Sequence, residues 1–164
     1  MKTITVTNQK GGVGKTTTVV NLASAIAQHG FKTLMMDMDP QSNATSGIGV
    51  EKAELENSVY AVLVGQKPLE KIVTPTQIKN LYLAPSGIDL VGTEIELAAA
   101  NNRESRLKQA LDNNESGFDF VFLDCPPSLG LITLNALVAS NSYIIPIQCE
   151  YYALEGLTQL IKTI

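Results

Sequence analysis

The residues with the clearest chemical potential form a glycine-rich turn, QKGGVGKTT, at positions 9–17. Glycines let successive backbone N–H groups point inward, and such groups bind an anion. A helix that begins here would add the positive end of its dipole. Lys15 supplies a full charge for β- and γ-phosphates, and Thr16 supplies a hydroxyl ligand for Mg²⁺. The turn therefore predicts a site for the phosphates of a nucleotide.

The spacing of this turn departs from the ordinary phosphate-loop pattern G-x-x-x-x-G-K-[ST]. Gly14, Lys15 and Thr16 satisfy its second half, but Gln9 stands where the first glycine belongs, and Lys10 lies inside the loop. A turn that merely joins a strand to a helix is the alternative, and Lys10 alone could be a solvated loop lysine. A turn between a predicted strand and a predicted helix is where open α/β sheets bind ligands, which favours the phosphate site.

Two carboxylate segments follow apolar runs further along the chain. The segment DMDPQSNAT begins with Asp37 and contains Asp39, and Asp124 ends the run FDFVFLD before CPPS. A carboxylate at a strand end beside a phosphate loop can hold Mg²⁺ or a water molecule. The alternative for Asp37 and Asp39 is a surface loop with two helix-capping aspartates. Pro126 and Pro127 should stiffen the exit of the last strand.

Short apolar runs alternate with helical spacing along the chain, which predicts an α/β fold: a mostly parallel sheet with helices on both faces. Continuous apolar runs such as FDFVFL fit strands that are covered on both sides. Residues 46–76 indicate short helices and loops. The predicted strands are 3–7, 32–37, 81–84, 118–124 and 143–148, and the predicted helices are 16–29, 104–111, 131–139 and 153–164.

Composition bounds the class of protein. The chain has 164 residues, 45% of them apolar and 17% charged, which indicates one domain over 1–164 and argues against disorder. The net charge of −4 gives no global basic field for nucleic acid or lipid, although local patches remain open. Two cysteines cannot build a disulfide framework, and neither a signal peptide nor a membrane span is visible, so a cytoplasmic protein is expected. Cys125 and Cys149 are expected to be structural, and His29 to end a helix.

Three motifs in order, KGGVGKTT, DMDPQSNAT and DCPPSLG, resemble the deviant Walker A ATPases of the ParA/MinD family. The resemblance implies a P-loop ATPase fold that binds ATP and Mg²⁺. Lys10 matches the family's signature lysine, which contacts phosphates bound by the other subunit of a nucleotide-sandwich dimer. Ser42 departs from the family, where glycine is usual. The implied nucleotide-binding residues are Lys10, Gly11, Gly12, Val13, Gly14, Lys15, Thr16 and Thr17.

The resemblance also implies roles for individual side chains. Asp39 would position the attacking water, and Asp37 would support the water shell of Mg²⁺. The implied catalytic residues are Lys10, Lys15 and Asp39. The implied metal residues are Thr16, Asp37, Asp39 and Asp124. Pro126, Pro127 and Ser128 would form switch II, whose backbone can sense the last phosphate.

The implied function is DNA partition. An ATP-dependent homodimer would bind DNA non-specifically, mainly through regions beyond residue 164, and a ParB-like partner would stimulate hydrolysis. Family members continue further, so a domain truncated at its C-terminus is expected, nucleoid-associated when ATP-bound and not on a membrane. Two alternatives stay open: a relative that positions another cargo, such as the cell-division site, and a nucleotide-binding fragment without turnover. Lys15 and Thr16 argue against a dinucleotide-binding enzyme, whose loop needs small residues there.

Overall fold

A computed structural model describes residues 1–50 and 58–149. Within them, a six-stranded sheet has the order β3-β4-β2-β5-β1-β6. Five strands run parallel, and β3 pairs antiparallel with β4 at one edge. The strands are β1 (Lys2–Val6), β2 (Thr33–Asp37), β3 (Thr74–Pro75), β4 (Leu81–Ala84), β5 (Phe120–Asp124) and β6 (Ser142–Ile144).

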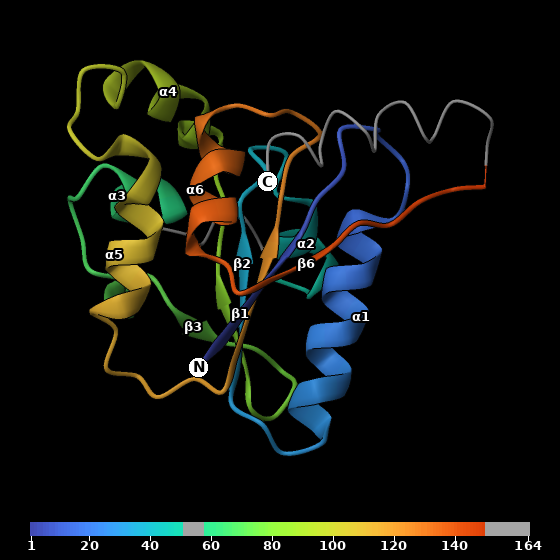
Figure 1. The fold of residues 1–164 in the computed structure, drawn as a ribbon. Coiled ribbons are helices and arrows are strands. Elements are labelled where there is room, and N and C mark those ends of the chain that lie inside the picture. The colour runs from blue at the N-terminus through green and yellow to red at the C-terminus, as the bar shows by residue number, and fades with distance from the viewer. Residues whose placement is uncertain (51–57, 150–164) are drawn as a thin grey trace.

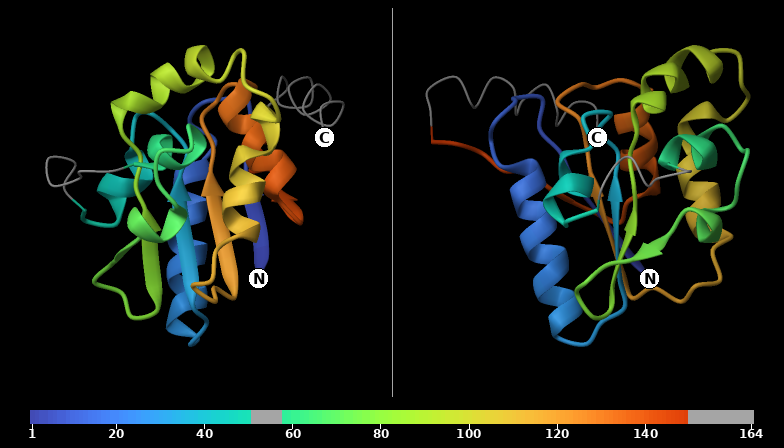
Figure 2. Two further views of the ribbon diagram at one scale, coloured as in Figure 1. Left: turned by 90° about the vertical axis from the view of Figure 1, so that its left-hand side faces the viewer. Right: turned by 180° about the vertical axis from the view of Figure 1, so that it is seen from behind.

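Helices cover both faces of this sheet (Figures 1 and 2). On one face lie α1 (Lys15–Gln28) and the short α2 (Asn43–Gly47), and on the other lie α3 (Val59–Leu63), α5 (Arg106–Asp112) and α6 (Leu131–Ala139). Shorter turns are α4 (Thr93–Glu96) and the 3₁₀ helices η2 (Leu69–Lys71), η3 (Ile88–Gly92) and η4 (Arg103–Ser105). The predicted α/β class with a mostly parallel sheet is confirmed.

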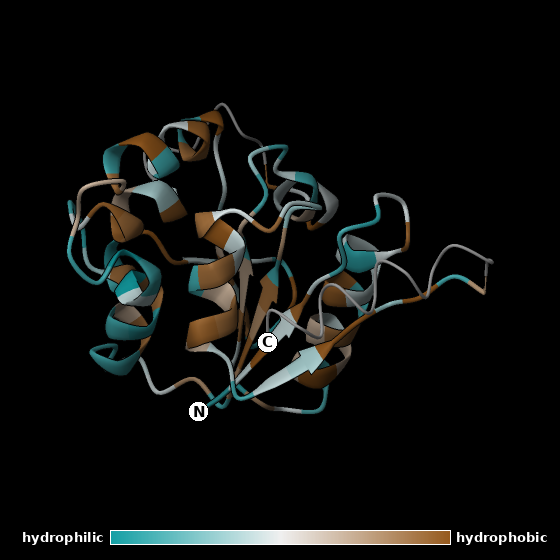
Figure 3. Ribbon diagram, turned by 45° about the horizontal axis from the view of Figure 1, so that its top comes forward, coloured by the Kyte–Doolittle hydropathy of each residue, from teal (hydrophilic) through white to brown (hydrophobic). Residues whose placement is uncertain are grey.

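Two apolar layers, one on each side of the sheet, hold these elements together. Val19 and Ala23 of α1 pack with Phe122 on one side, whereas Ile132 and Ala136 of α6 belong to the layer on the other. Because β5 lies between β1 and β2 and is covered on both faces, its last four residues are all buried. The hydropathy view shows α6 almost entirely apolar and α5 with a hydrophilic outer face (Figure 3). The arrangement explains why β5 reads as a continuous apolar run.

The structure corrects several element boundaries. The strand expected to run to Gln148 ends at Ile144, since Pro146 has no N–H to continue the ladder. The edge strand β3 was not expected; Pro75 is tolerated there because an edge position needs no donor. The helix predicted over 104–111 begins as η4 and continues as α5, and the turns at 88–96 were missed. The helix predicted over 153–164 lies outside the described residues.

The topology brings the carboxyl ends of β1, β2 and β5 to one edge of the sheet. In register, Val6 of β1 and Asp37 of β2 flank Asp124 of β5 on either side. The glycine-rich turn follows β1 and lies at the same edge, above the strand ends in Figure 1. The glycine-rich turn and the carboxylates at the ends of β2 and β5, which are far apart in the sequence, therefore lie at the same edge.

Candidate active site

The glycine-rich turn has the backbone conformation that an anion site needs. Gly12 and Gly14 have φ values of 75° and 90°, in the left-handed region that favours glycine. Helix α1 begins at Lys15 directly after Gly14, and neither a capping side chain nor an acidic residue occupies its first turn. The N–H groups and the positive dipole end of α1 are therefore left for a ligand.

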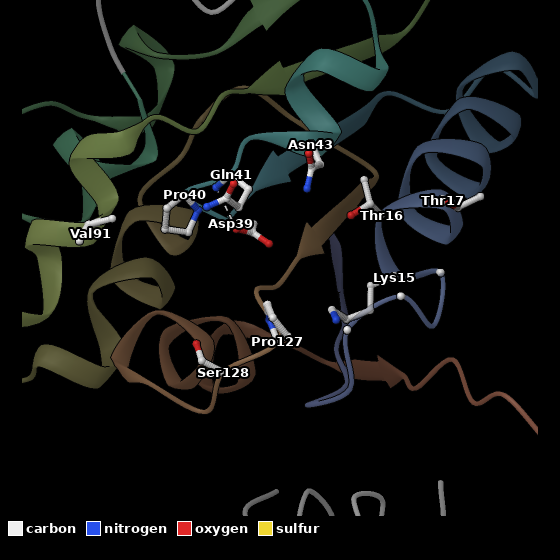
Figure 4. A pocket seen from close by; sticks show the side chains of 13 residues that line it. Lys15, Thr16, Thr17, Asp39, Pro40, Gln41, Asn43, Val91, Pro127 and Ser128 are labelled. Carbon is white, nitrogen blue, oxygen red and sulfur yellow. Dashed lines mark hydrogen bonds between the residues drawn. The ribbon is translucent and has the colours of Figure 1, made fainter. Parts of the chain in front are cut away.

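A cavity of about 780 Å³ opens beside this turn. Lys15 and Thr16 lie on one side of it, Asp39 lies opposite, and Pro127 lies between them at its base (Figure 4). Its volume falls within the range of small-molecule sites. The lining residues are Gly11, Gly12, Gly14, Lys15, Thr16, Thr17, Asp39, Pro40, Gln41, Asn43, Val91, Pro127 and Ser128.

Most of the predicted site residues line this cavity, but five do not. Lys10, Val13, Asp37, Asp124 and Pro126 are outside its lining. Val13 and Pro126 belong to the turns that shape the cavity wall. Lys10, Asp37 and Asp124 each have a chemical role that the family resemblance implies.

Lys15 is a buried cation at the wall of the cavity. Its side chain is 8% exposed, and its Nζ donates to the carbonyl oxygen of Lys10 at 3.1 Å. Burial lowers the pKa of Lys15, whereas the negative charges of Asp124 and Asp39 oppose that shift. An ammonium group with so little water around it is well placed to receive a phosphate oxygen.

Asp124 is a buried carboxylate at the end of β5. Neither of its carboxylate oxygens has a hydrogen-bond partner among the described residues, although the nearby Thr16 hydroxyl favours its charged form. Its pKa is raised to about 7, mainly by burial; the charges of Asp37 and Asp39 also raise it, whereas Thr16 and Lys15 lower it. Buried carboxylates without partners are rare, and a divalent cation is one group that satisfies them.

The chemistry of these donors fits Mg²⁺ in the manner of phosphate-loop proteins. No three Asp, Glu, His or Cys side chains gather as a metal cluster in the described part of the chain. Mg²⁺ keeps several waters and takes one or two protein oxygens together with substrate phosphates, so it needs no such cluster. Thr16 and Asp124 supply a hydroxyl and a carboxylate of this kind.

Asp37 has its hydrogen bonds committed to protein groups. Its Oδ2 accepts from the N–H and the hydroxyl of Thr45, both at 2.8 Å, and its Oδ1 accepts from the N–H of Asp39 at 3.1 Å. It is fully buried, and burial raises its pKa. In this structure Asp37 holds the segment that carries Asp39, and its predicted place in the metal's water shell stays a prediction.

The segment after β2 bends sharply at the residue that departs from the family pattern. Ser42 has φ 56° and ψ 40°, a left-handed conformation that glycine adopts at lower cost. Asp39 lies three residues earlier and presents its carboxylate to the cavity, where Oδ1 accepts from the N–H of Gln41 at 2.9 Å (Figure 4). Ser42 therefore adopts the left-handed conformation that favours glycine, the residue usual in the family at this position.

The switch II segment is fixed at its far end by helix α6. The hydroxyl of Thr133 donates to the carbonyl of Ser128 at 2.7 Å, and Oε1 of Glu94 accepts from the N–H of Leu131 at 2.9 Å. Pro127 and Ser128 line the cavity between this anchor and Asp124. A ligand that contacts them would act directly on the N-terminus of α6.

The remaining residues that were singled out from the sequence have simple roles. Cys125 is buried, and burial raises the pKa of its thiol, so it is a neutral core residue as predicted. Cys149 is exposed, which does not support the structural role expected for it. His29 is the C-terminal cap of α1, as predicted.

Asn8 is a site residue that the sequence patterns did not reveal. Its side chain is 6% exposed; its Nδ2 donates to the carbonyl of Pro146 at 2.8 Å, and its Oδ1 accepts from the N–H of Lys10 at 3.0 Å. It fixes the start of the turn to the segment after β6. Only its position just after β1 could have drawn attention to it.

The comparisons with known proteins agree with this geometry. A family model described as an AAA domain matches residues 1–164. The sporulation initiation inhibitor protein Soj of Bacillus subtilis is 54% identical over 99% of this chain and 64% of its own length. The chromosome partitioning protein ParA of Myxococcus xanthus is 50% identical over 98% of this chain and 57% of its own length. The chain thus spans less than two thirds of either relative.

Solved structures give the same fold. Cobyrinic acid a,c-diamide synthase from Mycobacterium smegmatis, with bound ADP and magnesium, matches with a TM-score of 0.94 and 40% identity, over 99% of this chain and 66% of that one. A plasmid partition protein from Borrelia burgdorferi matches with a TM-score of 0.88 and 28% identity, over 98% and 71%. Within the described residues, no helix is long and apolar enough to cross a membrane. On the strength of these matches and the three motifs, the chain belongs to the ParA/MinD family of deviant Walker A P-loop ATPases.

Proposed function

We propose that this chain carries the ATP-hydrolysing site of a ParA-like protein that partitions chromosomes or plasmids. The observation that supports it most is the buried carboxylate of Asp124, which has no hydrogen-bond partner among the described residues and lies behind Lys15 and Thr16, two residues that line the cavity. Such a group destabilises a protein unless a ligand uses it. The fold provides an open glycine turn and a helix N-terminus for the same ligand.

In this proposal the turn at 11–17 binds the phosphates of ATP through its N–H groups, and Lys15 neutralises charge on the β- and γ-phosphates. The Thr16 hydroxyl and the Asp124 carboxylate would hold Mg²⁺, directly or through its waters. When bound, Mg²⁺ neutralises charge on the phosphate oxygens. Positioning and charge stabilisation account for most of the rate in this reaction class.

Asp39 is proposed to orient the water that attacks the γ-phosphorus, while the bond to the β–γ bridging oxygen breaks. Lys10 would act on the nucleotide of a second copy of the chain, as a cation supplied in trans. Its N–H donates to Oδ1 of Asn8, and Lys10 does not line the cavity of its own chain. Closing two copies over two nucleotides would therefore complete each site.

The wider assembly is proposed from the family. The ATP-bound homodimer would bind DNA non-specifically and associate with the nucleoid in the cytoplasm, and a ParB-like protein would accelerate hydrolysis. Hydrolysis would reopen the dimer and release DNA. DNA contacts would come mainly from residues beyond this chain, consistent with its net charge of −4.

The test measures phosphate release against protein concentration for the wild type, Lys10→Ala and Lys15→Ala. We expect turnover per subunit to rise with concentration in the wild type and not in Lys10→Ala, and nucleotide binding to be lost in Lys15→Ala. Lys108→Ala is the control, because Lys108 pairs with exposed Asp112 on α5. Turnover that is independent of concentration and unaffected by Lys10→Ala would overturn the role in trans.

The cellular process that the ATPase drives needs its own test, because similar proteins are named for different processes. ParA of Myxococcus xanthus is named for chromosome partitioning at 50% identity, and Soj of Bacillus subtilis for inhibition of sporulation initiation at 54%, whereas the Mycobacterium smegmatis structure is named a diamide synthase at 40%. Stimulation of hydrolysis by a ParB-like protein with DNA supports partitioning. Tight ATP binding with no phosphate release under those conditions would instead identify a nucleotide-binding module without turnover.

A further inference from the structure

The main chain of Asp39 is held by hydrogen bonds at both ends of the residue. Its N–H donates to Oδ1 of Asp37 at 3.1 Å, and its carbonyl oxygen accepts from the hydroxyl of Ser86 at 2.6 Å. The carboxylate that faces the cavity therefore stands on a backbone unit with little freedom. The second contact comes from Ser86, which lies outside all three sequence motifs.

Ser86 belongs to a closed ring of hydrogen bonds. It is 1% exposed, and its N–H donates to the hydroxyl oxygen of Thr45 at 3.2 Å. That hydroxyl in turn donates to Oδ2 of Asp37 at 2.8 Å. The ring joins the end of β2, helix α2 and the segment after β4, so three elements fix the position of Asp39.

We propose that Ser86 is a positioning residue for hydrolysis, which holds the Asp39 carboxylate where it orients the attacking water. The proposal rests on the proposed function of Asp39. Ser86 follows β4, which pairs with β2 along its whole length. The position of the Ser86 hydroxyl is therefore set by the sheet, and this hydroxyl can hold the irregular segment that carries Asp39. Without that hydroxyl, the Asp39 carbonyl would lose its partner and the segment could shift.

A small shift is enough to matter for this chemistry. Misplacement of a reacting group by about 1 Å can cost on the order of 100-fold in rate. Ser86 does not line the cavity, so its removal should leave contacts with the nucleotide unchanged. The expected signature is a loss in kcat without a matching change in nucleotide affinity.

The test compares the wild type, Ser86→Ala and the control Ser140→Ala. Ser140 also donates its hydroxyl to a backbone carbonyl, that of Ala136 at 2.8 Å, but it is the C-terminal cap of α6, on the face of the sheet opposite to α2 (Figure 1). We expect Ser86→Ala to lower kcat about 10- to 100-fold, with the Kd for a fluorescent ATP analogue within threefold, and Ser140→Ala to leave both unchanged. An equal loss in affinity and turnover, or no loss in kcat, would overturn the proposal.

A double-mutant cycle separates positioning from a general structural effect. If Ser86 acts through Asp39, Ser86→Ala should cause no further loss in single-turnover rate in an Asp39→Asn background. A loss of the same factor in both backgrounds would show that Ser86 acts independently of Asp39, against the proposal.

Hydrogen exchange of the nucleotide-free protein tests the placement without any turnover. Residues 38–47 should exchange faster in Ser86→Ala than in the wild type and Ser140→Ala. Unchanged exchange would refute the structural step, whatever the activity. Faster exchange in a protein whose wild type hydrolyses no ATP would keep the placement and defeat the proposed function instead.

Discussion

Replacing Asp124 with Asn should make the nucleotide-free protein more stable at neutral pH and above. Asp124 is fully buried, and its carboxylate oxygens have no hydrogen-bond partner among the described residues. Asn has almost the same shape and carries no charge at any pH. The substitution therefore removes the cost of a buried negative charge while keeping the packing at the end of β5.

The size and sign of the effect follow from the pKa of Asp124, which burial raises from 3.8 to about 7. Between these values the folded protein binds more protons than the unfolded chain, so its free energy of unfolding decreases as pH rises. Each pKa unit corresponds to about 1.4 kcal/mol, which makes the total cost by pH 8 on the order of 4 kcal/mol. Below about pH 4 both states are protonated, and the cost disappears.

Urea denaturation in the presence of a chelator measures the free energy of unfolding at several pH values between 4 and 8. The free energy of unfolding of Asp124→Asn should rise relative to the wild type by several kcal/mol across this range. Asp112→Asn is the control, because that carboxylate is exposed and pairs with Lys108. A difference between Asp124→Asn and the wild type that stays constant with pH would refute the reasoning.

Adding Mg²⁺ and ADP should make the wild type more stable to unfolding than Asp124→Asn. A ligand that binds only the folded state stabilises it by an amount that grows with its concentration over Kd. The wild type should gain stability from the pair, while Asp124→Asn should gain much less, because the metal's carboxylate is missing. Equal gains would show that Asp124 takes no part in metal binding.

Three further substitutions test the surroundings of the site. Ser42→Gly should stabilise the protein by about 1 kcal/mol in urea, because Ser42 has φ 56°; a destabilisation would show that its buried hydroxyl outweighs the backbone cost. Gly130→Ala should cost about 1 kcal/mol, since the new Cβ would clash with Oε1 of Glu94 and displace it from the N–H of Leu131; an unchanged Tm would contradict this. Phe122→Ala should cost about 3–5 kcal/mol by calorimetry, and a smaller loss would mean that the core collapses around the gap.

The fold class was accessible from the sequence because its signals are local. Apolar runs such as 118–124 and the helical spacing of 16–29 each require only neighbouring residues, and both elements are present with small shifts in their ends. The edge strand β3 could not be predicted in the same way. It has two residues, one of them Pro75, and it exists only because β4 offers a partner.

The residues of the candidate site likewise fall into those that local sequence signals predict and those that they do not. The glycine turn and the carboxylates at the ends of β2 and β5 were predicted, because parallel strands place their carboxyl ends at one edge. Ser86 and Asn8 were not, since their partners are distant in sequence: Ser86 bonds Asp39 at a separation of 47 residues, and Asn8 bonds Pro146 at 138. A serine or asparagine that forms one long-range hydrogen bond has no pattern of its own.

Asp37 and Asp124 are two buried aspartates with different effects: one stabilises the backbone of the site, and the other is proposed to bind the metal. Both end neighbouring strands in register, and both are fully buried. Asp37 accepts hydrogen bonds from Thr45 and Asp39 and so stabilises the backbone of the site, whereas Asp124 has no hydrogen-bond partner in the described part of the chain and its burial is unfavourable. Functional sites commonly retain one group that the folded state does not satisfy. Since binding would relieve the energy stored at Asp124, the same carboxylate that weakens the free protein should make its stability depend on magnesium and nucleotide.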